Sequence, residues 1–281
     1  MKITKGIDKI IIEQPEDFDV IQTLNCGQIF RFSIDGNSAK VYSMDKCANI
    51  YWDSDKIEIN TDSVDYFYNF FDLDRDYSQI KKLLSKDKFL SSAVEYGSGI
   101  RIINNDAYEI IISFIISANN NIKRIKNSIE YLCRHFGKNM GNYFAFPTLA
   151  ELKKVSIKQF QEANLGYRAE QMFCTVQRLT EQDIEKLKSA EKDEQYKFLL
   201  SLKGVGEKVA NCIMLFGLGV KDVFPVDTWI NKVYNDLTNT NTTDRKKITQ
   251  ELTARYKDYS GYAQQYFFYY YRDNKISKIS R

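Results

Sequence analysis

The segment AYEIIISFIISA, residues 107–118, constrains the fold more than any other part of the sequence. It is apolar on nearly every face of a helix, so other elements have to surround it. A chain of 281 residues is long enough to build one large domain or two ordinary ones around such a helix. Hydrophobic residues make up 43% and charged residues 27%, which is typical of a globular protein. We therefore expect 107–118 to be a buried central helix.

The first hundred residues differ from the rest because apolar and polar residues alternate over short runs. Such alternation predicts half-buried strands, and turn residues between the runs predict hairpins. The expected strands lie in IDKIIIEQ, IFRFSIDGNSAKVYSM (a hairpin turning at 35–37), NIYWD and KIEIN, with helices near 17–24 and 63–84. From residue 101 the pattern is helical. We predict an α+β protein: a domain over 1–100 with a small antiparallel sheet, then an all-helical body over 101–281.

Two stretches in the helical part have the spacing of a capping box. Thr148 with Glu151, and Ser156 with Gln159, put a hydroxyl three residues before a carboxylate or an amide. This arrangement satisfies free backbone N–H groups at a helix start. Helices are therefore expected to begin just after Thr148 and Ser156.

Several classes of site are excluded by residue counts. The cysteines, at 26, 47, 133, 174 and 212, are odd in number and scattered, which indicates a reducing compartment and excludes a tightly spaced iron–sulfur cluster. His135 is the single histidine, so a multi-histidine metal centre is excluded. The formal net charge of +3 does not by itself indicate a nucleic-acid partner. With no signal-peptide pattern and no apolar run of about 18 residues, we expect a cytoplasmic protein without a membrane span.

The segment SLKGVGEKVANC, residues 201–212, predicts two helices joined by a tight glycine turn. Gly204 and Gly206 permit unusual backbone conformations, and the turn exposes N–H groups that can bind an anion. Lys208 falls in the first turn of the second helix, where the helix field and partial burial favour the neutral, nucleophilic amine. Two simpler interpretations stay open here: a purely structural turn, and a surface lysine whose stem lies along an apolar helix.

Asp227 follows Pro-Val in the segment FPVDTW, at the start of another predicted helix. It is either an ordinary N-cap or a carboxylate that the cap holds rigidly toward a cleft shared with Lys208. In the second case it can stabilise a developing cation or transfer protons. The glycine turn, Lys208 and Asp227 are much more specific together than any of them alone.

These residues belong to a longer series of motifs. The series is NCGQIFRF (25–32), SFIISANNNIKRI (113–125), NLGYRAEQM (164–172), LKGVGEKVANC (202–212), VFPVDTW (223–229) and GYAQQYFF (261–268). In content and order it resembles the 8-oxoguanine DNA glycosylase/lyases of the helix-hairpin-helix (HhH-GPD) superfamily. The resemblance spans 25–268 and implies a TBP-like antiparallel sheet domain before a helical glycosylase body.

The resemblance assigns the chemistry to two residues. Lys208 aligns with the family's nucleophile, which attacks C1′ of the damaged nucleotide, expels the base and forms a Schiff base that permits β-elimination. Asp227 aligns with the aspartate that stabilises positive charge on the sugar. The lesion has to leave the base stack before Lys208 can reach it.

The resemblance also implies a pocket for the flipped base. Gly27 aligns with a glycine whose carbonyl accepts a hydrogen bond from N7–H, a proton that guanine lacks. Gln264 would read the Watson–Crick edge. Phe268 and Cys212 would sandwich the base, with Phe114 nearby, although the two phenylalanines alone would be read as core residues.

Further positions are implied to contact the duplex. Asn119 would fill the gap left by the base, Arg124 and Arg168 would read the orphaned cytosine, and Tyr167 would wedge beside it. Trp229 stands where the family has a phosphate-binding histidine, and its indole N–H would donate to the phosphate instead. Backbone N–H groups of the hairpin would hold a DNA phosphate, and backbone carbonyls would hold a monovalent cation. The N–H groups belong to Gly204, Val205 and Gly206, and the carbonyls to Leu200, Leu202 and Val205.

The expected protein is therefore a bifunctional base-excision repair enzyme, monomeric and nucleoid-associated in a prokaryote, that acts on double-stranded DNA with 8-oxoguanine opposite cytosine. No redox or organic cofactor is expected. Two alternatives stay open. A monofunctional alkylated-base glycosylase usually lacks the lysine at 208, and a helix-hairpin-helix DNA-binding module has no need of Asp227.

Overall fold

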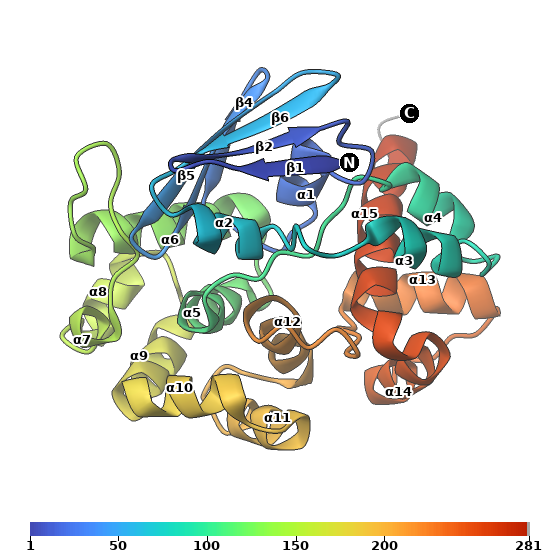
Figure 1. Cartoon of the computed structure of the whole chain (residues 1–281). Coiled ribbons are helices and arrows are strands. Elements are labelled where there is room, and N and C mark those ends of the chain that lie inside the picture. The colour runs from blue at the N-terminus through green and yellow to red at the C-terminus, as the bar shows by residue number, and fades with distance from the viewer. Residues whose placement is uncertain (280–281) are drawn as a thin grey trace.

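A six-stranded antiparallel sheet forms the N-terminal part of the computed structural model, which describes residues 1–279 and side chains through residue 274. The strand order is β1-β2-β6-β5-β4-β3 (Figure 1). The strands are β1 (Lys2–Lys5), β2 (Lys9–Glu13), β3 (Phe32–Asp35), β4 (Ser38–Ser43), β5 (Lys46–Trp52) and β6 (Lys56–Asn60). The expected sheet is confirmed, and β1 is a strand that the sequence analysis missed because its residues are mostly polar.

Alternating isoleucines bury one face of this sheet. Ile10 pairs with Ile59, Ile12 pairs with Ile57, and all four side chains are almost fully buried. The helices α1 (Val20–Asn25) and α2 (Val64–Phe70) contribute apolar side chains to the same core cluster. The sheet is therefore half covered, as its alternating sequence requires.

The single helix expected over 63–84 is wrong, because the structure has two helices there. These are α2 and α3 (Tyr77–Leu84), and α4 (Ser91–Tyr96) follows them. Asp72 lies between α2 and α3 with a left-handed backbone, φ +50°. Its carboxylate accepts hydrogen bonds from Arg75 Nε at 2.8 Å and from the Tyr77 hydroxyl at 2.9 Å. These local bonds offer the backbone an alternative to the helix, and they end α2.

The helical body surrounds α5 (Ala107–Ser117), whose residues 107–116 are all buried. The prediction of a central helix is thus confirmed, and α5 packs against α6, α9 and α12. Both predicted capping boxes are present, at the starts of α7 and α8. The remaining elements are α6 (Ile122–Phe136), α7 (Leu149–Leu152), α8 (Ile157–Glu162), α9 (Arg168–Arg178), α10 (Glu181–Ser189), α11 (Lys192–Leu200), α12 (Glu207–Gly217), α13 (Thr228–Thr238), α14 (Arg245–Tyr256), η1 (Lys257–Tyr259) and α15 (Ser260–Ile279).

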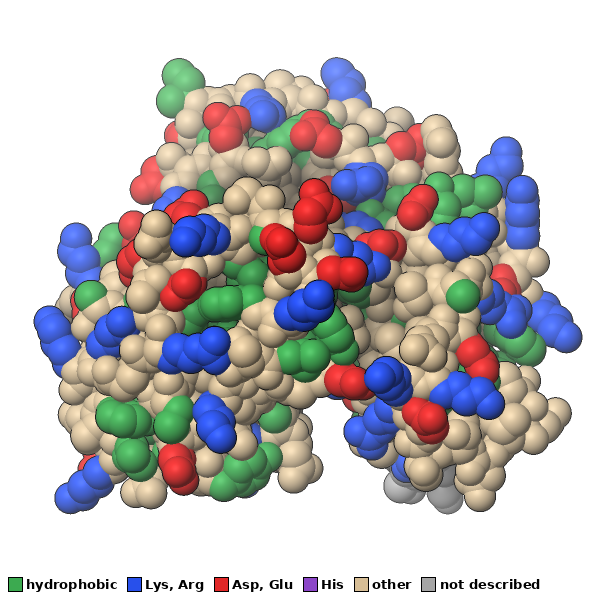
Figure 2. All heavy atoms as spheres, turned by 90° about the horizontal axis from the view of Figure 1, so that it is seen from below, with side chains coloured by type: hydrophobic (Ala, Val, Ile, Leu, Met, Phe, Trp, Pro, Cys, Tyr) green, Lys and Arg blue, Asp and Glu red, His purple; other side chains and the backbone are tan. Residues whose placement is uncertain are grey.

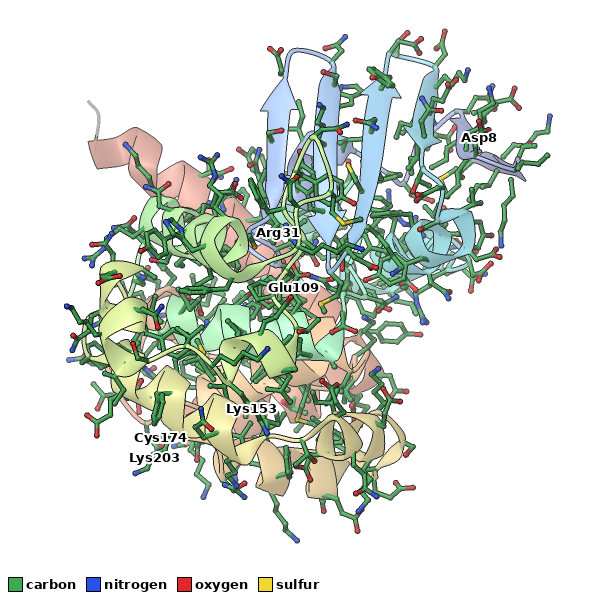
Figure 3. All side chains as sticks on the ribbon, turned by 90° about the vertical axis from the view of Figure 1, so that its left-hand side faces the viewer. Asp8, Arg31, Glu109, Lys153, Cys174 and Lys203 are labelled. Carbon is green, nitrogen blue, oxygen red and sulfur yellow. The ribbon has the colours of Figure 1, made fainter. Side chains whose placement is uncertain are left out.

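A buried ion pair joins the sheet to the helical body. Arg31 and Glu109 face each other at this junction (Figure 3), with Arg31 Nη1 3.9 Å from Glu109 Oε2 and both side chains at most 4% exposed. The Met44 N–H donates to Glu109 Oε2 at 2.6 Å, and Arg31 Nη2 donates to the Phe144 carbonyl at 2.6 Å. Burial raises the pKa of Glu109, and Arg31 opposes that rise. The pair is therefore stabilised by its backbone partners as well as by its charges.

Two core clusters lie on either side of this junction, one under the sheet and one in the helical body. Side chains of α3 and α4 belong to the helical cluster although they precede residue 100. The domain boundary at residue 100 stays a prediction. No helix among residues 1–279 is long and apolar enough to cross a membrane.

Candidate active site

The predicted glycine turn joins α11 to α12, and side chains of α9 and α5 pack against one side of it. Gly204 has φ +84°, and a Cβ there would lie 3.0 Å from Gln171 Oε1 and 3.2 Å from Ile115 Cγ2, so the turn packs tightly on α9 and α5. The Thr175 hydroxyl donates to the Lys203 carbonyl at 2.8 Å. By contrast, a Cβ on Gly206, the N-cap of α12, would meet nothing within 4 Å. The front of the turn is thus open to an anion at a helix N-terminus.

Lys208 lies in the first turn of α12, where two other predicted residues meet it. Its Nζ lies 5.2 Å from the centre of the Phe114 ring. Cys212 is one turn further along α12, on the same face, and is 4% exposed. Burial raises the pKa of the Cys212 thiol, the Lys208 amine opposes this rise, and the Asp227 carboxylate adds to it. Lys208, Phe114 and Cys212 therefore form one cluster, and Asp227 lies near enough for its charge to act on the Cys212 thiol.

Asp227 is the N-cap of α13, which the sequence analysis expected either as its ordinary role or as the means of fixing a catalytic carboxylate. It precedes α13, and its Oδ1 accepts a hydrogen bond from the Ile230 N–H at 2.9 Å. The side chain is only partly buried, so the cap fixes the carboxylate without removing it from solvent. The N-cap interpretation and the catalytic one are thus compatible.

Gly27 and Phe268 meet although they lie near opposite ends of the chain. Gly27 has φ +81°, and a Cβ there would lie 3.1 Å from Phe268 Cε1. Arg272, one turn beyond Phe268 in α15, donates through Nη1 to the Asn25 carbonyl at 2.6 Å. Phe30 continues the same loop and packs on Phe114, with ring centres 5.6 Å apart. The loop over 25–30 thus connects α15 with the cluster around Lys208.

Gln264 lies one turn before Phe268 in α15 and is 5% exposed. Its Oε1 accepts a hydrogen bond from Gln265 Nε2 at 2.7 Å. The sequence analysis missed Gln265 and Arg272. A pair of glutamines within the aromatic stretch YAQQYFFYYY was the one available signal, because a polar residue there has to be buried with a partner.

The loop after α5 lies against the start of α9. Arg168 is 4% exposed, and its guanidinium donates to the carbonyls of Ala118 and Asn119 at 2.5 Å and of Leu165 at 3.3 Å. Asn119 is exposed with φ +49°. Tyr167 is 57% exposed, and its ring centre lies 4.5 Å from the Arg168 guanidinium carbon. The buried Arg168 side chain therefore holds the loop that carries Asn119. The sequence analysis expected Arg168 to read a base, and in this structure its guanidinium is engaged by backbone carbonyls instead.

The other two predicted duplex contacts lie at the starts of α6 and α13. Arg124 is exposed on the first turn of α6, with Nη2 3.5 Å from the Asn164 carbonyl. Trp229 is partly buried in the first turn of α13, and Lys232 Nζ lies 5.5 Å from its ring centre. Among the described residues, no ring contact or hydrogen bond joins Trp229 to Lys208, Phe114 or Cys212.

The residues of the predicted cation site lie at the end of α11 and in the turn. The Leu202 carbonyl accepts a hydrogen bond from the Val205 N–H at 3.2 Å, which leaves it one lone pair. The neighbouring carbonyls of Ser201 and Lys203 accept from Arg178 and Thr175 of α9 instead. The turn is compatible with carbonyl ligation from Leu200, Leu202 and Val205. Over the described part of the chain, no group of three or more His, Cys, Asp or Glu side chains is arranged to hold a metal.

The molecule has a notch between two lobes when it is viewed from below (Figure 2). A helical fold with a helix-hairpin-helix element, a lysine on the second helix and a capped aspartate beyond it defines the class of HhH base-excision glycosylases.

Two family models match the chain in succession. The N-terminal domain of 8-oxoguanine DNA glycosylase matches residues 10–111, and the HhH-GPD superfamily of base excision DNA repair proteins matches residues 112–257. A crystal structure of the Clostridium acetobutylicum 8-oxoguanine glycosylase/lyase, in complex with double-stranded DNA containing cytosine opposite 8-oxoguanine, is 36% identical. It covers 98% of this chain and 99% of its own, with a TM-score of 0.92. The chain belongs to the 8-oxoguanine DNA glycosylase family of the HhH-GPD superfamily, as its motifs predicted.

Two curated relatives are eukaryotic. The N-glycosylase/DNA lyase of Arabidopsis thaliana is 32% identical over 200 residues, which cover 65% of this chain and 55% of the relative. The N-glycosylase/DNA lyase of Saccharomyces cerevisiae is 33% identical over 211 residues, which cover 60% of this chain and 56% of the relative. The chain thus spans little more than half the length of these two relatives.

Proposed function

We propose that this protein excises 8-oxoguanine from double-stranded DNA in which the lesion faces cytosine, and then cleaves the strand. The observation that carries the proposal is the cluster of Lys208 with Phe114 and Cys212, with Asp227 near enough for its charge to act on the Cys212 thiol. A primary amine beside an apolar ring and a fixed carboxylate suits attack on an electrophilic sugar carbon. The similarity to a glycosylase/lyase solved with 8-oxoguanine opposite cytosine supports the same substrate.

In the proposed reaction the Lys208 amine attacks C1′ of the flipped nucleotide. The bond from C1′ to the base breaks, and the base leaves with the bonding electron pair and takes up a proton. The bond between C1′ and the ring oxygen then breaks, the ring oxygen takes up the second amine proton, and an imine is left between Lys208 and the opened sugar. Loss of a C2′ proton expels the 3′ phosphate by β-elimination. Asp227 stabilises the positive charge that develops on the sugar, because its cap keeps the carboxylate in place.

Recognition of the lesion would depend on the loop at Gly27. Its carbonyl would accept a hydrogen bond from N7–H of 8-oxoguanine, whereas N7 of guanine is itself an acceptor and would be repelled. The close approach of Gly27 to Phe268 supports this assignment, because it brings this glycine beside a ring that can stack on the base. Gln264 would read the Watson–Crick edge, and Cys212 would contact the other face.

The duplex would bind across the open front of the hairpin and the loop after α5. The N–H groups at Gly204, Val205 and Gly206 would hold a phosphate, and carbonyls of the same turn a monovalent cation. Asn119 and Tyr167 would fill and wedge the gap left by the flipped base. Arg124 would read the opposite cytosine directly, and Arg168 would do so only if binding releases it from its carbonyl partners. The protein would act as a monomer in the cytoplasm, at the nucleoid, without a redox or organic cofactor.

Borohydride trapping tests the proposal. A duplex with one 8-oxoguanine opposite cytosine is incubated with the protein and reduced, and a covalent adduct is sought by gel shift, with an undamaged duplex alongside. Lys208→Gln should bind the lesion and form no adduct. Lys197→Gln, an exposed lysine on α11 of the same hairpin, is the matched control and should form the adduct normally.

Two results would contradict the proposal. Alkali-labile base loss without an adduct would indicate a monofunctional glycosylase. Binding without either signal, and without preference for the lesion, would indicate a helix-hairpin-helix DNA-binding module.

A further inference from the structure

Gln265 forms a pair with Gln264 inside α15. Gln264 is 5% exposed and Gln265 is 3% exposed. Gln265 Nε2 donates to Gln264 Oε1 at 2.7 Å, while Gln265 Oε1 is buried without a partner. Among the residues that the structure describes, none accepts a hydrogen bond from Gln264 Nε2. The bond within the pair therefore ties the orientation of one amide to that of the other.

The orientation seen here is favoured over its reverse for a physical reason. If both amides turned by 180°, Gln264 would donate to Gln265, and the buried orphan would be an NH₂ group in place of a carbonyl oxygen. An amide nitrogen carries two donors, and unpaired buried N–H groups are rarer in proteins than under-satisfied carbonyls. If only one amide turned, two oxygens or two nitrogens would face each other. The pair thus presents the nitrogen of Gln264 as its free donor.

We propose that Gln265 is a positioning residue that fixes the Gln264 amide and so selects a guanine-type base edge. The proposal rests on the function proposed above, in which Gln264 reads the flipped base. Guanine presents the O6 acceptor next to the N1–H donor, and adenine presents the N6–H donor next to the N1 acceptor. An amide can pair with either edge, but only in opposite orientations. With its nitrogen free and its oxygen held on the side of Gln265, Gln264 matches the guanine order.

Gln265→Glu reverses this selection. A carboxylate has no N–H to donate, so it would accept from Gln264 Nε2 and turn the amide. The assay is single-turnover excision of 8-oxoguanine and of 8-oxoadenine, each opposite cytosine, because both lesions carry N7–H and the 8-oxo group. We expect the wild type to excise 8-oxoguanine about a hundredfold faster or more. In Gln265→Glu the ratio of the two rates should fall at least about tenfold, with a relative gain for 8-oxoadenine.

Gln265→Met decides the question if the glutamate variant does not fold. It removes the donor without adding an acceptor, so Gln264 can take either orientation, and the ratio should fall by roughly tenfold. Gln195→Met is the matched control, because Gln195 is also buried, donates through Nε2 and has an unpaired Oε1, but lies in α11. It should leave the ratio unchanged.

A purely structural role for Gln265 would slow both lesions equally. An unchanged ratio in the variants that fold would overturn this proposal. A wild type that fails to excise 8-oxoguanine would instead overturn the proposed function, so the two failures are distinguishable.

Discussion

Gly27→Ala tests the proposed pocket for the lesion. The substitution has two separable effects, because Gly27 combines a left-handed backbone with a close aromatic neighbour. Gly36, in the turn between β3 and β4, has φ +53° and nothing within 4 Å of a built Cβ. Gly36→Ala therefore reports the backbone effect alone, and the difference between the two variants reports the contact with Phe268.

The magnitudes follow from these two terms. Left-handed backbone costs an alanine about 1–2 kcal/mol, and this term applies to both variants. A methyl group 3.1 Å from Phe268 Cε1 is overpacked, which adds about 1–3 kcal/mol for Gly27→Ala unless the ring moves. Because the ring would stack on the flipped base, its displacement should slow excision by about tenfold to a hundredfold. Gly36→Ala should keep its excision rate.

The assay combines urea unfolding with single-turnover excision of 8-oxoguanine. We expect the free energy of unfolding to fall in both variants, and further in Gly27→Ala. If Gly27→Ala excises the lesion as fast as Gly36→Ala, the close approach of Gly27 to Phe268 has no part in the reaction, and the reasoning is refuted.

Three further predictions concern charged residues. Asp227→Asn should keep the N-cap and most of the free energy of unfolding, whereas Asp227→Ala should lower that free energy by about 1 kcal/mol. Both variants should release the base about a hundredfold more slowly or worse, and normal rates would exclude a catalytic role for Asp227. Arg124→Met should weaken the preference for cytosine opposite the lesion without changing urea stability, and an unchanged preference would exclude Arg124 as a reader. Arg168→Met should weaken that preference and also lower the free energy of unfolding by about 1–3 kcal/mol, because the partly buried carbonyls of Ala118 and Asn119 lose their charged donor. Burial lowers the pKa of Lys221 from 10.5 to about 8, so between these values the unfolded chain binds the extra proton and stability rises with pH. The free energy of unfolding of the wild type relative to Lys221→Met should therefore rise by about 2 kcal/mol from pH 7.5 to pH 10, and a flat difference would contradict this.

Local sequence was sufficient for much of the fold and for the motif at the centre of the site. The segment over 107–118 had to be buried because it is apolar on every face, whatever surrounds it. The capping boxes and the glycine turn were equally predictable, since each depends on residues within a few positions of one another. The family motifs added residue roles that no local pattern contains.

The break between α2 and α3 shows where local patterns stop being informative. Asp72 ends α2 through bonds to Arg75 and Tyr77, and its carbonyl also accepts from Arg101, which is fully buried. The sequence over 63–84 does not indicate this break, because Arg101 lies outside that segment and reaches Asp72 only in the folded chain. The end of α2 is therefore stabilised by a residue from a distant segment, Arg101.

Tertiary structure alone decided which residues meet. Gly27 touches Phe268 because α15 returns to the loop after α1, and no periodicity relates two positions so far apart. Arg168 is buried because the loop after α5 supplies carbonyls for its guanidinium, although an arginine in a loop motif is usually exposed. The sequence by itself determined the elements and the chemical groups that they carry. Their distances, burial and hydrogen-bond partners depend on packing between distant segments, and these set how the groups can act.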